Sequence, residues 1–239
     1  MSNFTETLWT DNQFIQDYRD DASVYLPFRS TFFEIANSYI KFFFEAEKSV
    51  RMLDLGCGDG LFVQQLFENC NHMKIVTMVD GSEDMLSAAK QRLRGHDNLT
   101  YLNASFQELL ENDPLSQKYD LIFSSLAIHH LNLEEKVCIY KYIFDHLNLD
   151  GHFLHYDIVL ASNYRAERWN MSLWQNWIAA HPDKDKLTKL MGIPDQYKAN
   201  TDNIPDTLDA QLNSLKAIGF KNVDCFFKYG AFSLFGGSK

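Results

Sequence analysis

The feature that most constrains the fold of this chain is a glycine-rich turn after a short apolar segment. Residues 50–55, Val-Arg-Met-Leu-Asp-Leu, are typical of a buried parallel strand. Residues 56–60 read Gly-Cys-Gly-Asp-Gly, and residues 62–67 are typical of a helix. Glycine reaches positive φ and has no Cβ, so a ligand can press against the main chain there. The unpaired N–H groups at the start of the helix favour an anionic group. The sequence therefore predicts a strand, a ligand-binding turn and a helix, in this order.

The glycine spacing separates this turn from the dinucleotide-binding fingerprint. Gly-x-Gly-x-x-Gly would place glycines at 56, 58 and 61, but residue 61 is leucine and the third glycine stands at 60. Asp54 lies two residues before the first glycine, from where its carboxylate can reach across the turn. The pattern disfavours a nicotinamide-dependent dehydrogenase. A glycine-rich turn without any ligand remains open at this point.

A second apolar segment ends in an acid at the distance expected for a ribose ligand. Residues 73–79 lead into Asp80, which lies 20 residues beyond Gly60. A carboxylate offers two acceptor oxygens to two adjacent hydroxyls, and this separation is typical of an acid that binds the ribose of a nucleotide. A simple cap or turn role is the alternative for Asp80. Ser82 is predicted to cap the helix that follows.

Apolar segments alternate with helices along the middle of the chain. The strand-like segments are residues 50–55, 73–79, 99–103, 119–123 and 149–157. This alternation predicts an α/β fold with a doubly wound, mostly parallel sheet. In such a sheet ligands bind at the carboxyl ends of the strands.

The Asp-x-Gly-x-Gly-x-Gly pattern at residues 54–60 resembles motif I of the class I S-adenosylmethionine-dependent methyltransferases. Residues 119–131 resemble motif IV of the small-molecule branch of that family, and residues 207–237 resemble its last helix and antiparallel strands. The resemblance implies a Rossmann-like seven-stranded sheet with an antiparallel last strand and a helical cap. It also implies methyl transfer to a small-molecule substrate, with S-adenosyl-L-methionine as cofactor and S-adenosyl-L-homocysteine as product.

The resemblance assigns cofactor binding to the residues that match these motifs. In the family the glycine loop wraps the methionine part and the ribose, and the segment after the third strand contacts the adenine. Ser105 departs from the usual Asp of that segment, although its hydroxyl can accept one hydrogen bond and Phe106 can line the adenine slot. Arg29 is expected to pair with the methionine carboxylate. The expected cofactor-binding residues are Asp54, Gly56, Cys57, Gly58, Gly60, Asp80, Gly81, Ser105, Phe106, Ser124 and Arg29.

Candidate catalytic residues follow the fourth and fifth strand-like segments. Methyl transfer from a sulfonium is an in-line displacement, so the protein aligns the acceptor and removes its proton where needed. His129 and His130 are candidate bases, because imidazole exchanges protons near neutral pH. Asp157 and Tyr156 are placed at the end of the fifth segment. The alternatives are that the histidines only begin the next helix and that Asp157 only caps one.

The acceptor site is expected on the two flanking regions, because the core strands are committed to the cofactor. Tyr18 and Tyr25 belong to the aromatic N-terminal region, and Tyr156 faces it from the core. Trp169, Trp174 and Trp177 are spaced so that they can share one face of a helix. Such a stripe either packs a lid or forms an aromatic acceptor pocket. Tyr18, Tyr25, Tyr156, Trp169 and Trp174 are the expected substrate residues.

Bulk composition excludes other classes of function. No apolar run approaches the roughly 20 residues of a membrane span, and the N-terminus lacks the pattern of a signal peptide, so we expect a cytoplasmic protein with no membrane partner. The formal net charge of −10 disfavours a nucleic-acid partner. The four cysteines (57, 70, 138 and 225) lack Cys-x-x-Cys spacing, which predicts reduced thiols and no metal site. We expect a monomer or a homodimer.

Four parts are predicted along the 239 residues. They are an N-terminal helical cap (1–48), the cofactor-binding Rossmann-like core (49–160), a helical lid insertion (161–205), and a C-terminal helix and β-hairpin (206–239) that complete the sheet.

Two other functions stay open beside small-molecule methylation. The C-terminal part is also similar to carboxy-S-adenosylmethionine synthases, whose extra carboxylate would require an added cation, and to tRNA-modifying methyltransferases. Residues 169–215 contain lysines but no arginine, and the acidic charge disfavours RNA. A non-catalytic module that binds the cofactor or another protein is the second alternative. Intact Asp54, glycines and Asp80 argue for cofactor binding without establishing catalysis.

Overall fold

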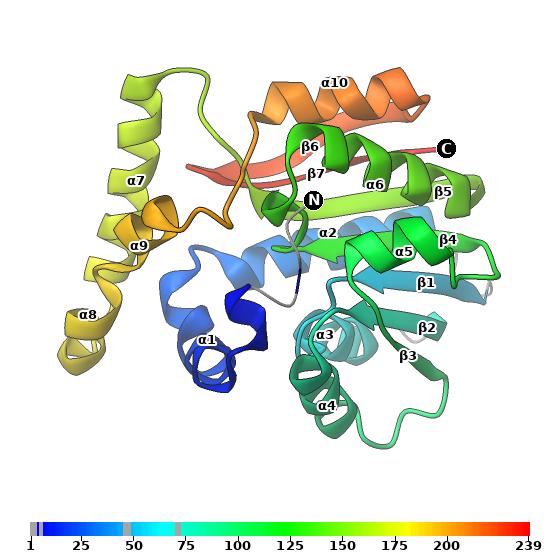
Figure 1. Cartoon of the computed structure of the whole chain (residues 1–239), viewed down its shortest axis with the longest axis horizontal. Coiled ribbons are helices and arrows are strands. Elements are labelled where there is room, and N and C mark those ends of the chain that lie inside the picture. The colour runs from blue at the N-terminus through cyan, green and yellow to red at the C-terminus, as the bar shows by residue number, and fades with distance from the viewer. Residues whose placement is uncertain (1–3, 5–6, 45–48, 70–72) are drawn as a thin grey trace.

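The computed structural model describes residues 4, 7–44, 49–69 and 73–239, with a sheet at its centre and helices on both sides (Figure 1). The described strands lie in the order β3-β2-β1-β4-β5-β7-β6. β7 is antiparallel to both of its neighbours, and the other pairs are parallel. The predicted doubly wound α/β sheet with an antiparallel last strand is confirmed. The strands are β1 (Val50–Leu55), β2 (Met73–Asp80), β3 (Leu99–Asn103), β4 (Tyr119–Ser125), β5 (Leu147–Ile158), β6 (Lys221–Tyr229) and β7 (Phe232–Ser238).

The helices form a cap, two layers on the sheet and an inserted group. The cap holds the short 3-10 helix η2 (Leu8–Thr10) and α1 (Asn12–Tyr25). One layer holds α2 (Arg29–Phe43), α3 (Leu61–Asn69) and α4 (Glu83–Arg92), and the other holds α5 (Phe106–Asn112), α6 (Leu133–His146) and α10 (Leu208–Ile218). The 3-10 helix η3 (Ile128–His130) precedes α6, and the insertion holds α7 (Tyr164–Ala179), α8 (Lys184–Leu190) and α9 (Ile193–Ala199). Residues 45–48 of the predicted cap lie outside the described residues.

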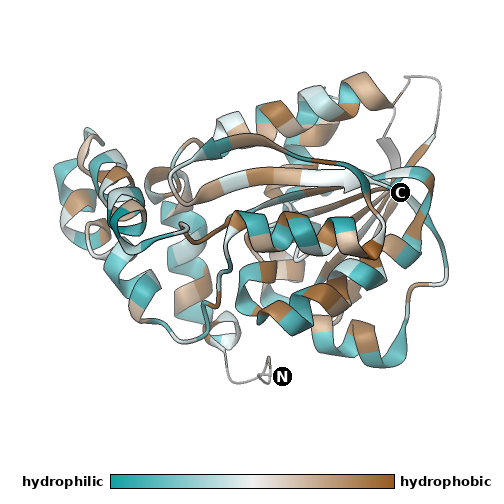
Figure 2. Cartoon of the chain, turned by 90° about the horizontal axis from the view of Figure 1, so that it is seen from above, coloured by the Kyte–Doolittle hydropathy of each residue, from teal (hydrophilic) through white to brown (hydrophobic). Residues whose placement is uncertain are grey.

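Successive residues of a strand belong to two separate hydrophobic clusters, one on each face of the sheet. In β4, Leu121 and Phe123 join one cluster, and Ile122 between them joins the other. Because both faces are covered, the middle of a central strand is apolar on both sides and does not alternate with polar residues. Figure 2 shows this difference: the helices carry hydrophilic bands, whereas the central strands are mostly hydrophobic or neutral.

The strand order fixes where a ligand can bind. β1 pairs with β2 on one side and with β4 on the other, so the connections leave β1 in opposite directions. Such a switch point opens a crevice at the carboxyl ends of the strands. The glycine-rich turn lies at this end, directly after Leu55.

The cap and the insertion are joined to each other at the same end of the sheet. The indole Nε1 of Trp174 donates to the carbonyl of Tyr25 at 2.6 Å, and that of Trp177 donates to the carbonyl of Val24 at 2.9 Å. Lys186 and Lys189 of α8 both pair with the carboxylate of Asp21 in α1. The inserted helices therefore extend the N-terminal cap.

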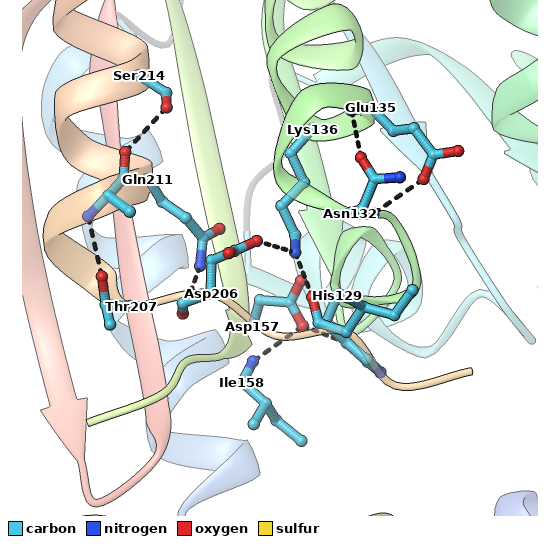
Figure 3. Close-up of polar contacts among 12 residues, drawn as sticks. His129, Asn132, Glu135, Lys136, Asp157, Ile158, Asp206, Thr207, Gln211 and Ser214 are labelled. Atoms are coloured by element: carbon cyan, nitrogen blue, oxygen red, sulfur yellow. Dashed lines mark hydrogen bonds and ion pairs between the residues drawn. The ribbon is translucent and has the colours of Figure 1, made fainter. Parts of the chain in front are cut away.

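The segment 202–206, which follows the insertion, is attached to the core beside His129 (Figure 3). The N–H of Ile204 donates to the carbonyl of His129 at 2.8 Å. Lys136, whose side chain is fully buried, donates to the carbonyl of Ile204 and pairs with Asp206 at 2.6 Å. Removing one partner of a buried ion pair is strongly unfavourable, so this lysine holds the segment against the core.

Two further observations concern the described residues as a whole. None of the helices described here combines the length and the apolar character that crossing a bilayer requires. Cys57, Cys138 and Cys225 are free thiols, and Cys70 lies outside the described residues.

The close approach of β7 to β5 gives a test of the fold. A Cβ on Gly236 would lie 1.9 Å from the carbonyl oxygen of Phe153, so β7 would have to move away from β5. We expect Gly236→Ala to lower the free energy of unfolding by about 3 kcal/mol, as overpacking does. Gly192→Ala is the control, because its Cβ would meet only the side chain of Gln196, at 3.3 Å. Urea unfolding measures both variants, and equal midpoints would contradict the described β5–β7 contact.

Candidate functional site

Two adjoining cavities lie at the carboxyl ends of the strands. The first, called here the turn cavity, is formed by the glycine-rich turn, the ends of β1 and β2, and residues of the cap. The second, called the lid cavity, lies between the cap, η3 and the inserted helices and has a volume of about 310 Å³. Trp9, Tyr18, Leu126 and His130 line both cavities and so form the wall between them.

The glycine-rich turn is shaped by hydrogen bonds to β2. The N–H groups of Gly56 and Cys57 donate to the carbonyl of Val79 at 2.8 and 3.0 Å. Gly56 and Gly58 have φ values of +69° and +54°, which favour glycine. A Cβ on Gly58 would meet nothing within 4 Å, so the main chain here faces the open cavity.

Gly60 has a different role from the one that was expected. Its φ is +77°, but it does not line the turn cavity. A Cβ at this position would meet Met78, Ala89 and Leu93 at 3.1–3.2 Å. The structure therefore places Gly60 where α4 and β2 pack against the turn, away from the expected contact with a ligand.

Asp80 links the turn to the start of α4. Its Oδ2 accepts from the N–H of Gly58 at 2.8 Å, and its Oδ1 accepts from the N–H of Ser82 at 2.9 Å. Burial raises the pKa of Asp80 to about 6, although both backbone hydrogen bonds act to lower it. Asp80 and Gly81 both line the turn cavity. Asp80 can therefore accept hydrogen bonds from the backbone before α4 and also face a ligand in the turn cavity.

Asp54 is a buried carboxylate that no described residue satisfies. It is 1% exposed, lines the turn cavity, and has no hydrogen-bond partner for either oxygen in the described chain. Burial first, and then the nearby charge of Asp80, raise the pKa of Asp54 to about 8. A buried polar group of this kind is costly unless a partner satisfies it. The cavity therefore presents an acceptor that suits a cationic or hydrogen-bond-donating ligand.

Arg29 lines the same cavity from the first turn of α2. Its guanidinium lies over the rings of Tyr18 and Phe33, with 5.9 and 5.6 Å to the ring centroids. Its Nε is buried and has no hydrogen-bond partner in the described chain. A buried guanidinium nitrogen without a partner thus accompanies the unsatisfied carboxyl group of Asp54 in this cavity.

The expected residues after the third and fourth strands divide between the cavity and the core. Ser105 and Phe106 line the turn cavity. The Ser105 hydroxyl also accepts from the N–H of Glu108 at 3.2 Å as part of a capping box. Ser124 points away from the cavity and donates to the carbonyl of Leu55 at 2.7 Å, while Ser125 lines the cavity. Neighbouring strand residues face opposite sides, and the expectation for Ser124 is corrected to Ser125.

His129 lines the lid cavity and is hydrogen-bonded to the buried carboxylate of Asp157. Its Nδ1 lies 2.5 Å from Oδ1 of Asp157, and the imidazole lines the lid cavity. Oδ1 of Asp157 also accepts from the N–H of Ile158 at 2.9 Å, and Oδ2 pairs with Nε2 of His155 at 2.9 Å. Figure 3 shows the second ring nitrogen of His129 on the side away from Asp157. In the described chain Nε2 of His129 has no hydrogen-bond partner.

Asp157 is fully buried yet charged. Burial acts to raise its pKa, but the electrostatic interaction and hydrogen bond with His129 and the hydrogen bond with His155 outweigh this effect. The pKa of Asp157 therefore lies well below its usual range. A carboxylate on Nδ1 fixes the tautomer with the lone pair on Nε2. The pair thus presents a proton acceptor to the lid cavity.

His130 is engaged on both ring nitrogens. Its Nε2 accepts from the indole N–H of Trp9 at 2.9 Å, so its Nδ1 donates to the carbonyl of Asp202 at 3.0 Å. Burial, followed by the neighbouring His129, lowers the pKa of His130 to about 3. The neutral ring therefore joins the cap to segment 202–206, and its lone pair is occupied in this arrangement.

The expected substrate residues are brought together only in part. Tyr18, Tyr25 and Trp174 line the lid cavity. Tyr156 is fully buried and stacks on Phe32 at 4.2 Å, outside both cavity linings. Trp169 is 61% exposed and is also outside both linings. Five residues of helix separate Trp169 from Trp174 by about 140° around the axis, so the expected shared face does not form.

Several lining residues were not expected from the sequence. Trp9 lines both cavities and donates a hydrogen bond to His130, which is 121 positions away in the sequence. No local sequence pattern predicts such a contact. Residues of α9 and of the segment after it close the lid cavity from the far end of the insertion. These lining residues are Ile193, Gln196, Tyr197, Asn200, Asp202 and Asn203. The only feature of the sequence that could have indicated these residues is their position after a helix of the predicted lid.

Comparison with known proteins agrees with this architecture. A family model described as "Methyltransferase domain" matches residues 46–198. Malonyl-[acyl-carrier protein] O-methyltransferase of Bacillus anthracis is 32% identical over 108 residues, which are 45% of this chain and 37% of that protein. Carboxy-S-adenosyl-L-methionine synthase of Nautilia profundicola is 23% identical over 192 residues, or 77% of this chain and 75% of that protein. The chain thus spans well under half of the first of these relatives.

Solved structures share the fold at low sequence identity. An O-methyltransferase family protein from Burkholderia thailandensis has a TM-score of 0.68 at 12% identity, over 98% of this chain and 62% of that one. Human N-acetylserotonin methyltransferase has a TM-score of 0.56 at 16% identity, over 100% of this chain and 62% of that one. Because the family match covers more than half of the sequence, the chain belongs to the methyltransferase-domain family.

Proposed function

We propose that this protein transfers a methyl group from S-adenosyl-L-methionine to a small-molecule acceptor, with the cofactor in the turn cavity and the acceptor in the lid cavity. The observation that carries the proposal is a pair of buried polar groups without partners in the described chain, the carboxyl group of Asp54 and the Nε of Arg29, beside a turn whose main chain is open at Gly58. Two solved relatives of the same fold are described with this cofactor or its product, S-adenosyl-L-homocysteine.

The residues of the turn cavity fit the groups of this cofactor. Asp54 would accept from the methionine ammonium, and Arg29 would pair with the methionine carboxylate. Asp80, at the end of β2, would accept from the ribose hydroxyls, and Phe106 would lie against the adenine. When bound, S-adenosyl-L-methionine supplies a methyl group activated by a positively charged sulfur.

The lid cavity supports deprotonation of the acceptor. Asp157 orients His129, and Nε2 of His129 would take the proton from an acceptor placed against the wall shared by the two cavities. The acceptor atom forms its new bond to the methyl carbon as the carbon–sulfur bond breaks, and the electron pair of that bond passes to sulfur. The engaged ring of His130 leaves His129 as the base.

The relatives' own reactions fit this chain less well. Malonate carries a carboxylate, and a carboxylated cofactor carries one more than S-adenosyl-L-methionine. No lysine or arginine lines the lid cavity in the described part of the chain, so a carboxylate there would lose its hydration without a partner. The net charge of −10 also disfavours a tRNA acceptor. We therefore favour a methyl acceptor that is an uncharged small molecule.

Binding of the cofactor should release a proton from Asp54. At pH 7 a group with a pKa of about 8 is mostly protonated, and the ammonium of S-adenosyl-L-methionine would lower that pKa, so about one proton should be released per molecule bound. Release should diminish above pH 8, where Asp54 is already ionised. Calorimetric titration in buffers of different ionisation enthalpy measures it.

Variants assign this proton to its source. Asp54→Asn should abolish the release and weaken binding at least tenfold, whereas Asp97→Asn, on an exposed residue, should change neither. Binding heats that do not depend on the buffer would argue against Asp54 as the acceptor. Failure of both S-adenosyl-L-methionine and S-adenosyl-L-homocysteine to bind would overturn the proposed function.

Catalysis should depend on His129 without affecting cofactor binding. His129→Asn retains an N–H toward Asp157 but has no basic nitrogen, so turnover should fall about 10²–10⁴-fold. Incubation of a metabolite extract with methyl-labelled S-adenosyl-L-methionine, followed by mass spectrometry, detects products that gain one labelled methyl group. The affinity for S-adenosyl-L-homocysteine should stay within about twofold. Undiminished turnover in this variant would exclude His129 as the base.

A further inference from the structure

Aromatic side chains line much of the lid cavity, and contacts between their rings hold them in position. Six of its lining residues carry aromatic rings other than histidine: Trp9, Phe14, Tyr18, Tyr25, Trp174 and Tyr197. Trp9 packs edge to face against Phe14 and Tyr18, at centroid distances of 5.2 and 5.1 Å, and Trp174 packs on Tyr197 at 5.5 Å. Offset and edge-to-face contacts of this kind favour a further flat ring.

Apart from the two histidines and Asp202, the remaining lining is apolar, with a few uncharged polar groups. The apolar side chains are Leu8, Leu26, Leu126, Ile158 and Ile193, and the amides are Gln196, Asn200 and Asn203. Three lysines of the helices α6 and α8 pair with aspartates: Lys136 with Asp206, and Lys186 and Lys189 with Asp21. An anionic guest would therefore enter without a counter-ion, at a high desolvation cost.

A cationic guest also lacks a suitable partner. Asp157 lies behind His129, with its two oxygens occupied by His129, His155 and the N–H of Ile158. The other carboxylate of the lining, Asp202, is only partly buried, so water screens its charge. Aromatic faces attract cations in general, but no buried anion in the described lining remains to neutralise one.

We propose that the lid cavity binds an uncharged, planar aromatic alcohol, with its hydroxyl group on Nε2 of His129. This inference rests on the proposed function and specifies its acceptor. An aromatic hydroxyl titrates near pH 10 in water, so it stays neutral during entry and needs a base for attack. His129 receives the hydroxyl proton, the oxygen forms the bond to the methyl carbon, and the electron pair of the broken carbon–sulfur bond goes to sulfur. The product is an aryl methyl ether.

Three probes with the same ring system test the charge preference. They are 2-naphthol, 2-naphthoate and 2-naphthylmethylamine, which are respectively neutral, anionic and cationic at pH 7. Calorimetric titrations use the full chain, with and without S-adenosyl-L-homocysteine. We expect 2-naphthol to bind at least tenfold more tightly than either charged probe. Equal or tighter binding of 2-naphthoate or of 2-naphthylmethylamine would overturn the proposed substrate class.

Variants place the probe in the cavity. Ile193→Trp fills space in the cavity and should weaken 2-naphthol binding at least tenfold, with the affinity for S-adenosyl-L-homocysteine unchanged. Ile193→Phe is a milder version in case the larger side chain disturbs folding. Trp169→Phe, on the exposed side of α7, is the matched control and should leave both affinities unchanged. Unaltered 2-naphthol binding in both Ile193 variants would exclude this cavity as the binding site.

The two proposals fail in different ways. Loss of S-adenosyl-L-homocysteine binding would refute the cofactor site, while the titration of 2-naphthol in its absence still decides the lid cavity. If S-adenosyl-L-homocysteine binds and 2-naphthol does not, the cofactor assignment stands and the aromatic-alcohol assignment is wrong. His129→Asn should weaken 2-naphthol about fivefold or more, because the hydroxyl loses its acceptor.

Discussion

Three aspartates lie near the carboxyl ends of β1, β2 and β5, two of them fully buried, and the site depends on how each one is satisfied. Asp157 is held by two histidines and a backbone N–H, so it stays ionised. Asp80 is held by two backbone N–H groups, and its pKa rises only to about 6. Asp54 has no partner in the described chain, and its pKa rises to about 8. Burying a charge is costly without a partner, so the unsatisfied acid marks where a ligand must contribute.

The wall between the two cavities is held in place by hydrogen bonds between segments far apart in the sequence. Trp9 belongs to this wall, and its indole donates to His130, which in turn donates to the carbonyl of Asp202. This chain of bonds runs from the cap through the core to the end of the insertion. It occupies the lone pair of His130 and leaves that of His129 available. The two adjacent histidines therefore differ in role because of their partners, not because of their sequence.

The sequence predicted the core of the fold and site because local rules determine them. The apolar strands, the turn at residues 56–60 and the acid at the end of β2 follow from spacing alone, and the structure places Asp80 beside Gly58. Positions that depend on which way a strand residue faces were harder to predict. Ser124 and Ser125 are neighbours in one strand. Because neighbouring strand residues face opposite sides, Ser125 lines the turn cavity and Ser124 does not. Gly60 matched the motif but serves the packing of α4.

The cavity walls were less predictable, because they come from segments far apart in the chain. Trp9 and Tyr197 are brought to the lid cavity by tertiary contacts, and neither carries a motif. The prediction that the tryptophans share one helix face was wrong, because Trp169 and Trp174 point to different sides of α7. Aromatic content in the flanks indicated an acceptor region, and only the structure showed which rings form it.

The turn cavity and the lid cavity are held together by different kinds of contact. The turn cavity is built largely from main-chain hydrogen bonds between β1 and β2, which a change in the insertion would leave intact. The lid cavity depends on side-chain contacts between α1 and the inserted helices, including the bonds from Trp174 and Trp177 to the end of α1. The two cavities share only the residues of the wall between them, Trp9, Tyr18, Leu126 and His130, and changes at sites without shared contacts usually have additive effects. Substitutions in the inserted helices, outside the shared wall, would therefore alter the lid cavity while the main-chain bonds of the glycine-rich turn stay in place.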